Sequence, residues 1–270
     1  MTQNPSTPIA LTIAGSDSGG GAGIQADLKT FSALGVYGAS VITALTAQNT
    51  QTVSAIYDVT PEFIGQQINA VCSDLSVSAV KIGMLSQPTV IESIATGLLK
   101  HKLECIVLDP VMVAKSGDKL LQDDAVDALR NTLIPQAKLI TPNLPEACVL
   151  LNIDSINAND MEDAAHELLK LGCKAVLLKG GHLQNEQSMD LLVTGDNVTR
   201  LDAKRIATQN THGTGCTLSS AITAYLARGL TLSDAVKQAK EYINNAIAHA
   251  DELSIGHGHG PVHHFYQYWK

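Results

Sequence analysis

The chain has 270 residues, of which 45% are hydrophobic and 4% aromatic, and it carries a formal net charge of −8. This length allows one large α/β domain or two small ones, and the hydrophobic content is sufficient for a core of aliphatic side chains. The acidic balance argues against nucleic acids and anionic membranes as partners, because both need a basic face.

The cysteines and the N-terminus bear on the cellular compartment. The five cysteines form no C-x-x-C pair, so we expect free thiols, four of them in the core, in a protein of the reducing cytoplasm. Residues 1–8 are polar and lack the basic start and apolar run of a signal peptide, so they predict a flexible tail. No later run is long and apolar enough to cross a membrane.

Strand-like and helix-like segments alternate along the chain. We expect strands at residues 9–14, 36–47, 79–83, 105–109, 138–141 and 175–179, and a β-hairpin of residues 189–194 and 197–201. We expect helices at residues 24–34, 60–75, 89–100, 123–133, 145–151, 160–171, 218–228 and 233–250. The alternation predicts a mainly parallel sheet with helices on both faces, and ligands at the carboxyl ends of its strands. Since no linker or repeat interrupts it, we expect residues 9–270 to form one domain.

The stretch from Asn210 to Thr217 connects a β-rich segment to a helix. Gly213 and Gly215 stand just before that helix, where they would let the backbone turn tightly and leave its first N–H groups bare. Those donors and the helix dipole form an anion site, and the same field would lower the pKa of the Cys216 thiol. The alternative is an ordinary loop-to-helix junction with a buried cysteine.

A second glycine-rich segment, residues 15–23, follows the first strand. Residues 21–26 satisfy the dinucleotide pattern G-x-G-x-x-A, but no Asp or Glu occurs from Phe31 through Tyr57 to hold a ribose. This argues against a nicotinamide or flavin site, and the sequence contains no P-loop motif either. Five glycines in nine residues favour a loop close to a small ligand, with a purely structural turn as the alternative.

Polar residues follow several predicted strands. Asp109 and Glu146 could hold magnesium-bound water near a phosphate, and Lys179 leaves the sheet with room beside it for a ligand. The alternative is structural, with Asn143 or Thr141 capping the next helix and Glu146 complementing its dipole.

The histidines suggest two further sites, and the sequence argues against both. Those between residues 257 and 264 could bind a metal, but the glycines between them give poor preorganisation. His212 and Cys216 could form a hydrolase dyad, but one helical turn rarely aims both side chains at a shared substrate.

Taken together, these segments resemble a known family. The matching segments keep the family's order from residue 11 to residue 265, and they are Ala14–Asp17, Gly20–Thr30, Val41–Thr50, Lys81–Met84, Thr141–Ala147, Lys179–His182, His212–Cys216 and the terminal Gly-Pro-Val-His-His-Phe. On these motifs the chain resembles the ribokinase-like superfamily and, within it, the hydroxymethylpyrimidine/phosphomethylpyrimidine kinases of thiamine biosynthesis. The resemblance implies an α/β fold of three layers, with a mainly parallel central sheet between helices and a small β-hairpin.

The resemblance also implies a role for each motif. A homodimeric, ATP- and Mg²⁺-dependent enzyme would phosphorylate 4-amino-5-hydroxymethyl-2-methylpyrimidine and then its monophosphate. The pyrimidine would contact Gly15, Asp17, Ala22, Gln48, Met84 and Val111. ATP would lie near Asn143, Lys179 and Lys240, and the metal near Asp109 and Glu146. The catalytic group would be the backbone of Gly213, Thr214 and Gly215, which holds the phosphoryl group, together with Cys216.

The chain departs from the wider pattern in two places. Cys216 stands where sugar kinases of the superfamily carry an aspartate base, which is typical of the pyrimidine and vitamin branch. Ser18-Gly19 replaces the Pro-Ser common in this branch, so we expect a more mobile loop.

Two other functions stay open. The pyrimidine kinase is favoured by Gln48, which offers a donor and an acceptor side by side, as an aminopyrimidine requires. A pyridoxal kinase is the alternative, because a hydroxymethyl group on a substituted pyridine has nearly the same shape. A non-catalytic vitamin or nucleotide sensor is another, although it would not need Asn143, Glu146, Lys179 and Cys216 together.

Overall fold

The computed structural model describes residues 7–112, 123–181, 187–195 and 197–269. Residues 1–6 of the expected N-terminal tail, and His182 of one motif, lie outside these ranges. Among the described helices, none has the length and apolar character needed to cross a membrane.

Within the described ranges, nine strands form one sheet in the order β3-β2-β1-β4-β5-β6-β7-β8-β9. Their bounds are Ile9–Asp17 (β1), Tyr37–Gln48 (β2), Val53–Asp58 (β3), Ala79–Ile82 (β4), Ile106–Leu108 (β5), Leu139–Ile140 (β6), Val176–Lys179 (β7), Gln187–Thr194 (β8) and Asn197–Lys204 (β9). The six central strands, β2, β1, β4, β5, β6 and β7, are parallel. Strand β3 at one edge is antiparallel to β2, and at the other edge β8 is antiparallel to both β7 and β9. The strand order reverses at β1, which has β2 on one side and β4 on the other.

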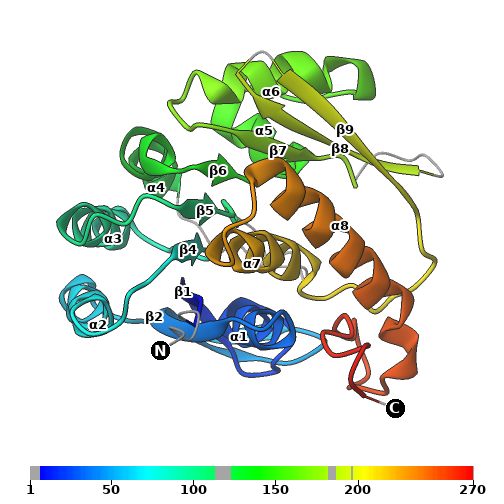
Figure 1. Cartoon of the computed structure of the whole chain (residues 1–270), viewed down its shortest axis with the longest axis horizontal. Coiled ribbons are helices and arrows are strands. Elements are labelled where there is room, and N and C mark those ends of the chain that lie inside the picture. Colours follow the sequence, from blue (N-terminus) through cyan, green and yellow to red (C-terminus); the bar gives the residue numbers. More distant parts are fainter. Residues whose placement is uncertain (1–6, 113–122, 182–186, 196, 270) are drawn as a thin grey trace, which may run out of the picture.

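Helices cover both faces of this sheet (Figure 1). One face is covered by α1 (Gly23–Ala33), α7 (Thr214–Ala227) and α8 (Leu232–Ala248). The other face is covered by α2 (Pro61–Cys72), α3 (Pro88–Lys100), α4 (Asp123–Ala128), α5 (Leu144–Leu151) and α6 (Met161–Leu169). The α/β fold with helices on both faces, predicted from the alternation of segments, is confirmed.

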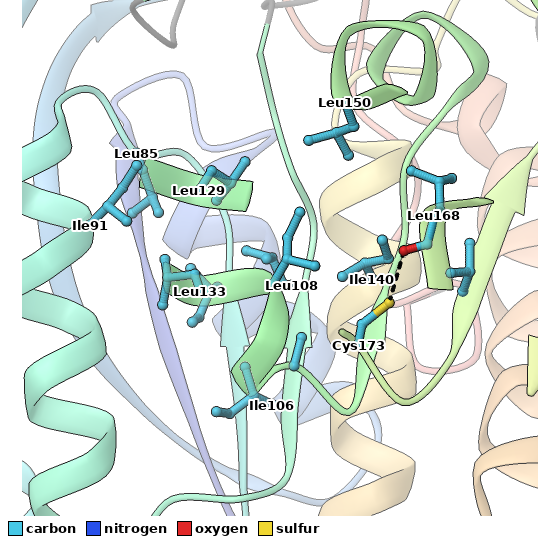
Figure 2. Close-up of a cluster of buried hydrophobic side chains, with 14 of the residues drawn as sticks. Leu85, Ile91, Ile106, Leu108, Leu129, Leu133, Ile140, Leu150, Leu168 and Cys173 are labelled. Carbon is cyan, nitrogen blue, oxygen red and sulfur yellow. Dashed lines mark hydrogen bonds between the residues drawn. The ribbon is translucent and has the colours of Figure 1, made fainter. Parts of the chain in front are cut away.

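Alternate side chains of the central strands enter two separate cores. Ile106 and Leu108 point into the cluster beneath α3, α5 and α6, which also contains Leu133, Ile140 and Leu168 (Figure 2). Val107, between them, enters the other cluster under α7 and α8. Because every second residue of a strand faces the same side, the two layers of helices each find an apolar surface on the same short strands.

Several elements differ from the prediction, among them α7, which begins at Thr214 rather than at the expected residue 218. β1 continues past Ala14 with a shift of register, because Ser16 and Asp17 still pair with β2. The sequence pattern does not predict β3, whose mostly exposed side chains lack a core face. The hairpin is longer than expected and extends the main sheet through pairing of β7 with β8. The helix expected at 123–133 is α-helical only to Ala128 and continues as a π-helical turn.

The cysteines are free, but fewer are buried than we expected. Only Cys173 is fully buried, and its thiol donates to the Leu168 carbonyl at 3.7 Å (Figure 2). Cys72, Cys105 and Cys148 are half-buried, so the expectation of four core thiols is wrong.

Candidate active site

The carboxyl ends of the parallel strands meet the start of α7 where the strand order reverses. A Cβ placed on Gly15, near the end of β1, would lie 2.9 Å from the sulfur of Met84, which follows β4. After β5 and β7, Lys179 Nζ lies 2.9 Å from Asp109 Oδ1. A Cβ on Gly215 of α7 would lie 3.5 Å from both Asp109 Oδ2 and Lys179 Nζ. The structure thus brings most of the expected site residues to one edge of the sheet, where open α/β folds bind ligands.

The glycine loop after β1 is folded around the carboxylate of Asp17. Oδ1 accepts from the Gly19 N–H at 2.8 Å, and Oδ2 accepts from the N–H groups of Gly21 at 3.0 Å and Ala22 at 2.8 Å. His212 Nε2 lies 2.9 Å from the same Oδ2. Burial would raise the pKa of Asp17, but the hydrogen bonds from His212 and the loop hold it below its ordinary value. Both oxygens are therefore engaged within the protein, which suits an organising role better than the substrate contact implied by the resemblance.

Ser18 ties this loop to β2. Its hydroxyl donates to the Gln48 carbonyl at 2.8 Å and accepts from the Gln48 N–H at 2.8 Å. The departure at Ser18-Gly19, which we expected to loosen the loop, supplies this attachment beside Gln48.

Gly213 allows α7 to start against the glycine loop. It has a φ of 79°, and a Cβ on it would lie 1.9 Å from the Gly21 carbonyl oxygen. Glycine alone among the residues adopts that conformation readily and also leaves room for this contact. The sequence prediction of a tight turn at this junction is confirmed.

At the start of α7, the N–H groups of Gly213, Gly215 and Cys216 have no acceptor in the described part of the chain, whereas the Thr214 N–H, which we expected to be bare, has one. The Thr217 N–H makes a helical hydrogen bond to the Gly213 carbonyl at 2.8 Å, and the Thr214 N–H donates to a preceding loop carbonyl at 3.3 Å. Gly215 and Cys216 lie between them, so their N–H groups have no acceptor within the helix. With the positive end of the helix dipole, they provide a site for an oxyanion.

The Cys216 thiol does not have the lowered pKa that we expected. Burial raises the pKa of Cys216 to about 11, and although Lys81 lowers it, Asp27 and Asp109 add to the rise. The helix field is outweighed because the thiolate would lose its hydration at this position. The thiol is therefore protonated at neutral pH.

The pair Lys179–Asp109 lies directly in front of the anion site. Asp109 Oδ1 also accepts from the Thr141 hydroxyl at 2.8 Å, and the residue is only 2% exposed. Burial would raise the pKa of Asp109, but Lys179 and then Lys81 hold it below its ordinary value. The carboxylate is therefore ionised.

Glu146 is buried, at 7% exposure. Its N–H donates to Asn143 Oδ1 at 2.8 Å, and its Oε2 accepts from the Asn143 N–H at 2.8 Å. This is a capping box at the start of α5, so the structural alternative for this pair is confirmed. Burial raises the pKa of Glu146 to about 7, with Lys179 opposing the rise and Asp109 adding to it.

Lys240 lies near the end of β7. Its ammonium group donates to one oxygen of Asp190, whose other oxygen accepts from the Gly180 N–H at 3.0 Å. The last long helix is thereby attached to the strand end that carries Lys179. Gly180 can have no side chain here, because a Cβ would lie 2.1 Å from a β8 carbonyl oxygen.

A second lysine–aspartate pair lies beneath the site and was missed by the sequence analysis. Lys81 Nζ donates to Asp27 Oδ2 at 2.8 Å, and neither side chain is exposed. The hydroxyls of Thr12 and Ser220 donate to the same carboxylate at 2.6 Å each. A signal was present, since a lysine between the buried Val80 and Ile82 of a central strand requires a buried carboxylate.

Residues 256–262, which we term the C-terminal strap, join the two sides of the site. On one side, Thr50 in the turn after β2 accepts from the N–H groups of His257, Gly258 and His259 at 3.3, 3.1 and 2.9 Å. On the other, the Gly260 carbonyl accepts from the His212 N–H at 3.0 Å.

The glycines of the strap explain the repeated Gly-His pattern. A Cβ on Gly258 would lie 2.2 Å from the Thr50 carbonyl oxygen, and one on Gly260 would lie 2.2 Å from Asn210 Oδ1. The described part of the chain contains no group of three or more His, Cys, Asp or Glu residues that could hold a metal ion.

The residues expected around the pyrimidine lie around the same edge. Met84 follows β4 and Val111 follows β5, where the Val111 N–H donates to the Asp109 carbonyl at 2.8 Å. Ala22 belongs to the glycine loop, and the Gln48 amide lies 3.4 Å from His212. His212 itself is a site residue that sequence reasoning considered only as a hydrolase partner.

An anion site facing a lysine–aspartate pair suits phosphoryl transfer, and solved structures share this fold. Pyridoxal kinase of Bacillus subtilis, solved as an ADP complex, aligns with a TM-score of 0.88 and 39% identity over 96% of this chain and 98% of that one. The fold and site define a kinase of small molecules with a ribokinase-like fold. Residues 17–263 match the model of the phosphomethylpyrimidine kinase family, and the chain belongs to that family.

Two relatives illustrate the match. A hydroxymethylpyrimidine/phosphomethylpyrimidine kinase of Rhizobium meliloti (strain 1021) is 57% identical over 266 residues, which cover 98% of this chain and 99% of that protein. A thiamine biosynthesis bifunctional protein of Geobacter sulfurreducens is 52% identical over 254 residues, which cover 94% of this chain and 51% of that protein.

Proposed function

We propose that this chain uses ATP to phosphorylate 4-amino-5-hydroxymethyl-2-methylpyrimidine and then its monophosphate, in thiamine biosynthesis. The observation that carries the proposal is the start of α7, where Gly215 faces the Lys179–Asp109 pair. Membership of the phosphomethylpyrimidine kinase family supports the reaction, and the names of the two relatives support the substrate and the pathway.

Positioning and charge stabilisation supply most of the catalysis in phosphoryl transfer. The backbone of Gly213, Thr214 and Gly215, together with the Cys216 N–H, would hold the transferred phosphoryl group, and Lys179 would offset its charge. Asn143 and Lys240 would border the nucleotide. Cys216 would face the hydroxymethyl group, and it can act as a base only after losing its proton, which the nearby Lys81 favours.

The pyrimidine would lie between the glycine loop and the strand ends. Gly15, Ala22, Met84 and Val111 would supply apolar and backbone contacts, and the Gln48 amide would pair with the ring nitrogen and the exocyclic amine. Asp17 would act by holding the loop in place rather than by touching the ring.

Mg²⁺ fits the acidic residues at the ends of β5 and β6. Asp109 Oδ2 and Glu146 Oε1 take no part in the hydrogen bonds described above, and a cation would relieve the repulsion between the two carboxylates. One or two carboxylates together with nucleotide phosphates are the usual Mg²⁺ ligands. When bound there, the metal would neutralise phosphate charge.

An ATP-consumption assay tests the proposal against four compounds: the aminopyrimidine, its monophosphate, pyridoxal and ribose. We expect turnover with the first two, less with pyridoxal and none with ribose. Preference for pyridoxal would favour a pyridoxal kinase, the alternative function that the likeness to the Bacillus subtilis enzyme supports. Absence of turnover with all four would support a sensor and overturn the kinase.

The proposed enzyme is a cytoplasmic homodimer. Residues 9–270 would act as one cytoplasmic kinase domain, which the single sheet supports. Leu45 and Tyr57 are paired across β2 and β3 and are 46% and 73% exposed, so this apolar edge would form a homodimer interface. Light scattering on the wild type and on Leu45→Lys/Tyr57→Lys tests it, since the variant should be monomeric.

A further inference from the structure

His212 is held in one position and one tautomer. Its backbone N–H donates to the strap at Gly260 (3.0 Å), and its ring packs so closely on Gly21 that a Cβ there would lie 2.4 Å from Cδ2. Its Nε2 lies 2.9 Å from the carboxylate of Asp17. Because an ionised carboxylate only accepts hydrogen bonds, Nε2 must carry the hydrogen.

This tautomer dictates how the amide of Gln48 must lie. Gln48 Nε2 is 3.4 Å from His212 Nε2, and Gln48 Oε1 is 3.1 Å from the Thr46 hydroxyl. The Thr46 hydroxyl has one hydrogen, which it donates to the Ser16 carbonyl at 2.8 Å. In that arrangement the Gln48 NH₂ group faces the N–H of His212, so two donors meet. Gln48 Oε1 faces the Thr46 hydroxyl oxygen, whose hydrogen points to Ser16, so two acceptors meet.

Turning the amide by half a turn corrects both contacts at once. Oε1 then faces the His212 Nε2–H, whose single hydrogen it shares with Asp17 Oδ2 in a three-centre bond, and Nε2 donates to the Thr46 hydroxyl oxygen. The two ends of an amide have nearly the same shape, so its hydrogen-bonding partners decide the orientation.

We propose that His212, held by Asp17, locks the Gln48 amide in this orientation and so determines which way round the pyrimidine binds. The lock rests on the proposed function, because it acts on the ring that Gln48 is proposed to contact. His212 is then a positioning residue that acts through Gln48 and determines specificity.

The locked amide presents its acceptor on the His212 side and its donor on the Thr46 side. A 4-aminopyrimidine pairs with that edge through its amino group and its ring N3. The amino group therefore lies on the His212 side, and the hydroxymethyl group lies there too, because it is on the next ring carbon. His212 directly precedes Gly213 at the start of α7, so the lock directs the hydroxymethyl group to the anion site. The opposite amide orientation would direct it away.

The test compares kcat/KM for the aminopyrimidine and for its 4-oxo analogue, which has the reversed donor and acceptor pattern. Wild type should reject the analogue. In His212→Leu, which removes the N–H, the amide can turn to match it, and the preference for the amino compound should fall by about tenfold, the order of discrimination of a bidentate contact. His212→Gln keeps an N–H at the reach of Nε2 and should retain the preference.

The ratio separates the lock from a loss of structure, because a merely destabilised enzyme would lose both activities equally. Thermal unfolding and the KM for ATP serve as controls. Thr46→Val removes the other anchor of the amide and should shift the ratio in the same direction, so it carries the test if His212→Leu does not fold. An unchanged ratio in the folded variants would overturn the lock and leave the kinase function standing. A wild type inactive on the aminopyrimidine would overturn the proposed function and the lock with it.

Discussion

Two lysine–aspartate pairs in this molecule have nearly the same separation and different surroundings. Lys81 and Asp27 lie 2.8 Å apart without exposed surface, enclosed by β4, α1 and α7. Lys179 and Asp109 lie 2.9 Å apart, but the lysine side chain is 16% exposed. In both, burial would lower the pKa of the lysine, yet the partner carboxylate raises it above its ordinary value.

The difference lies in what else each pair can bind. The Asp27 carboxylate is already shared by Thr12 and Ser220, so the inner pair is saturated by the protein. The outer pair borders the N–H groups of α7, where an arriving phosphate could take up Lys179. Exposure to an arriving ligand, rather than the distance within the pair, distinguishes the two pairs and makes Lys179–Asp109 the candidate for binding phosphate.

Lys81→Met should produce the largest loss of stability. It leaves the Asp27 carboxylate charged and without its counter-ion in a dry site, which costs about 3–5 kcal/mol in the free energy of unfolding. Urea unfolding measures the loss. The double variant Lys81→Met/Asp27→Leu should recover most of it, and a double variant no more stable than the single one would contradict this account.

Lys179→Met should affect turnover more than stability. Loss of one charge-stabilising group typically lowers turnover by about a hundred- to a thousand-fold. The loss of stability should be smaller than for Lys81→Met, because water reaches the exposed side of the pair. The measurements are kcat and urea unfolding on the same preparation, and turnover within tenfold of wild type would remove Lys179 from the site.

Cys216→Ala tests the thiol that lies near both pairs. Phosphorylation of the alcohol must remove a proton, so a base contributes about a hundred-fold or more. The monophosphate is attacked through an oxygen that is already largely ionised, since its second pKa is about 6. The alcohol step should therefore slow far more than the monophosphate step. Equal losses would indicate that Cys216 acts by packing or by positioning the phosphate.

Ser220→Ala should give the smallest of these effects, a loss of about 2 kcal/mol in the free energy of unfolding, because its hydroxyl donates to the buried Asp27 carboxylate at 2.6 Å. Ser219→Ala is the matched control, since that buried hydroxyl donates to carbonyls of its own helix, at 3.0 and 3.1 Å, rather than to a carboxylate. If the two variants lose the same stability, the inner pair does not depend on Ser220.

The sequence predicts the fold and the edge of the sheet that carries the site, because alternating segments imply parallel strands whose carboxyl ends coincide. It does not predict contacts between distant side chains. Lys81 and Asp27 are 54 positions apart, and His212 and Asp17 are 195 positions apart. The raised pKa of Cys216 was missed for a related reason. Its place in the sequence reveals that it lies at the start of a helix, but not that distant residues bury the thiol and exclude water from it.

The C-terminal strap also sets the order in which the chain can complete its site during synthesis. The chain is synthesised from its N-terminus, and a domain generally folds as a unit. The glycine loop, the turn at Thr50 and the start of α7 all precede residues 256–262, which hold Thr50 and His212 in place. A nascent chain that lacks the strap lacks these contacts, so we expect the turn at Thr50 and the start of α7 to take their final positions only after synthesis passes residue 262.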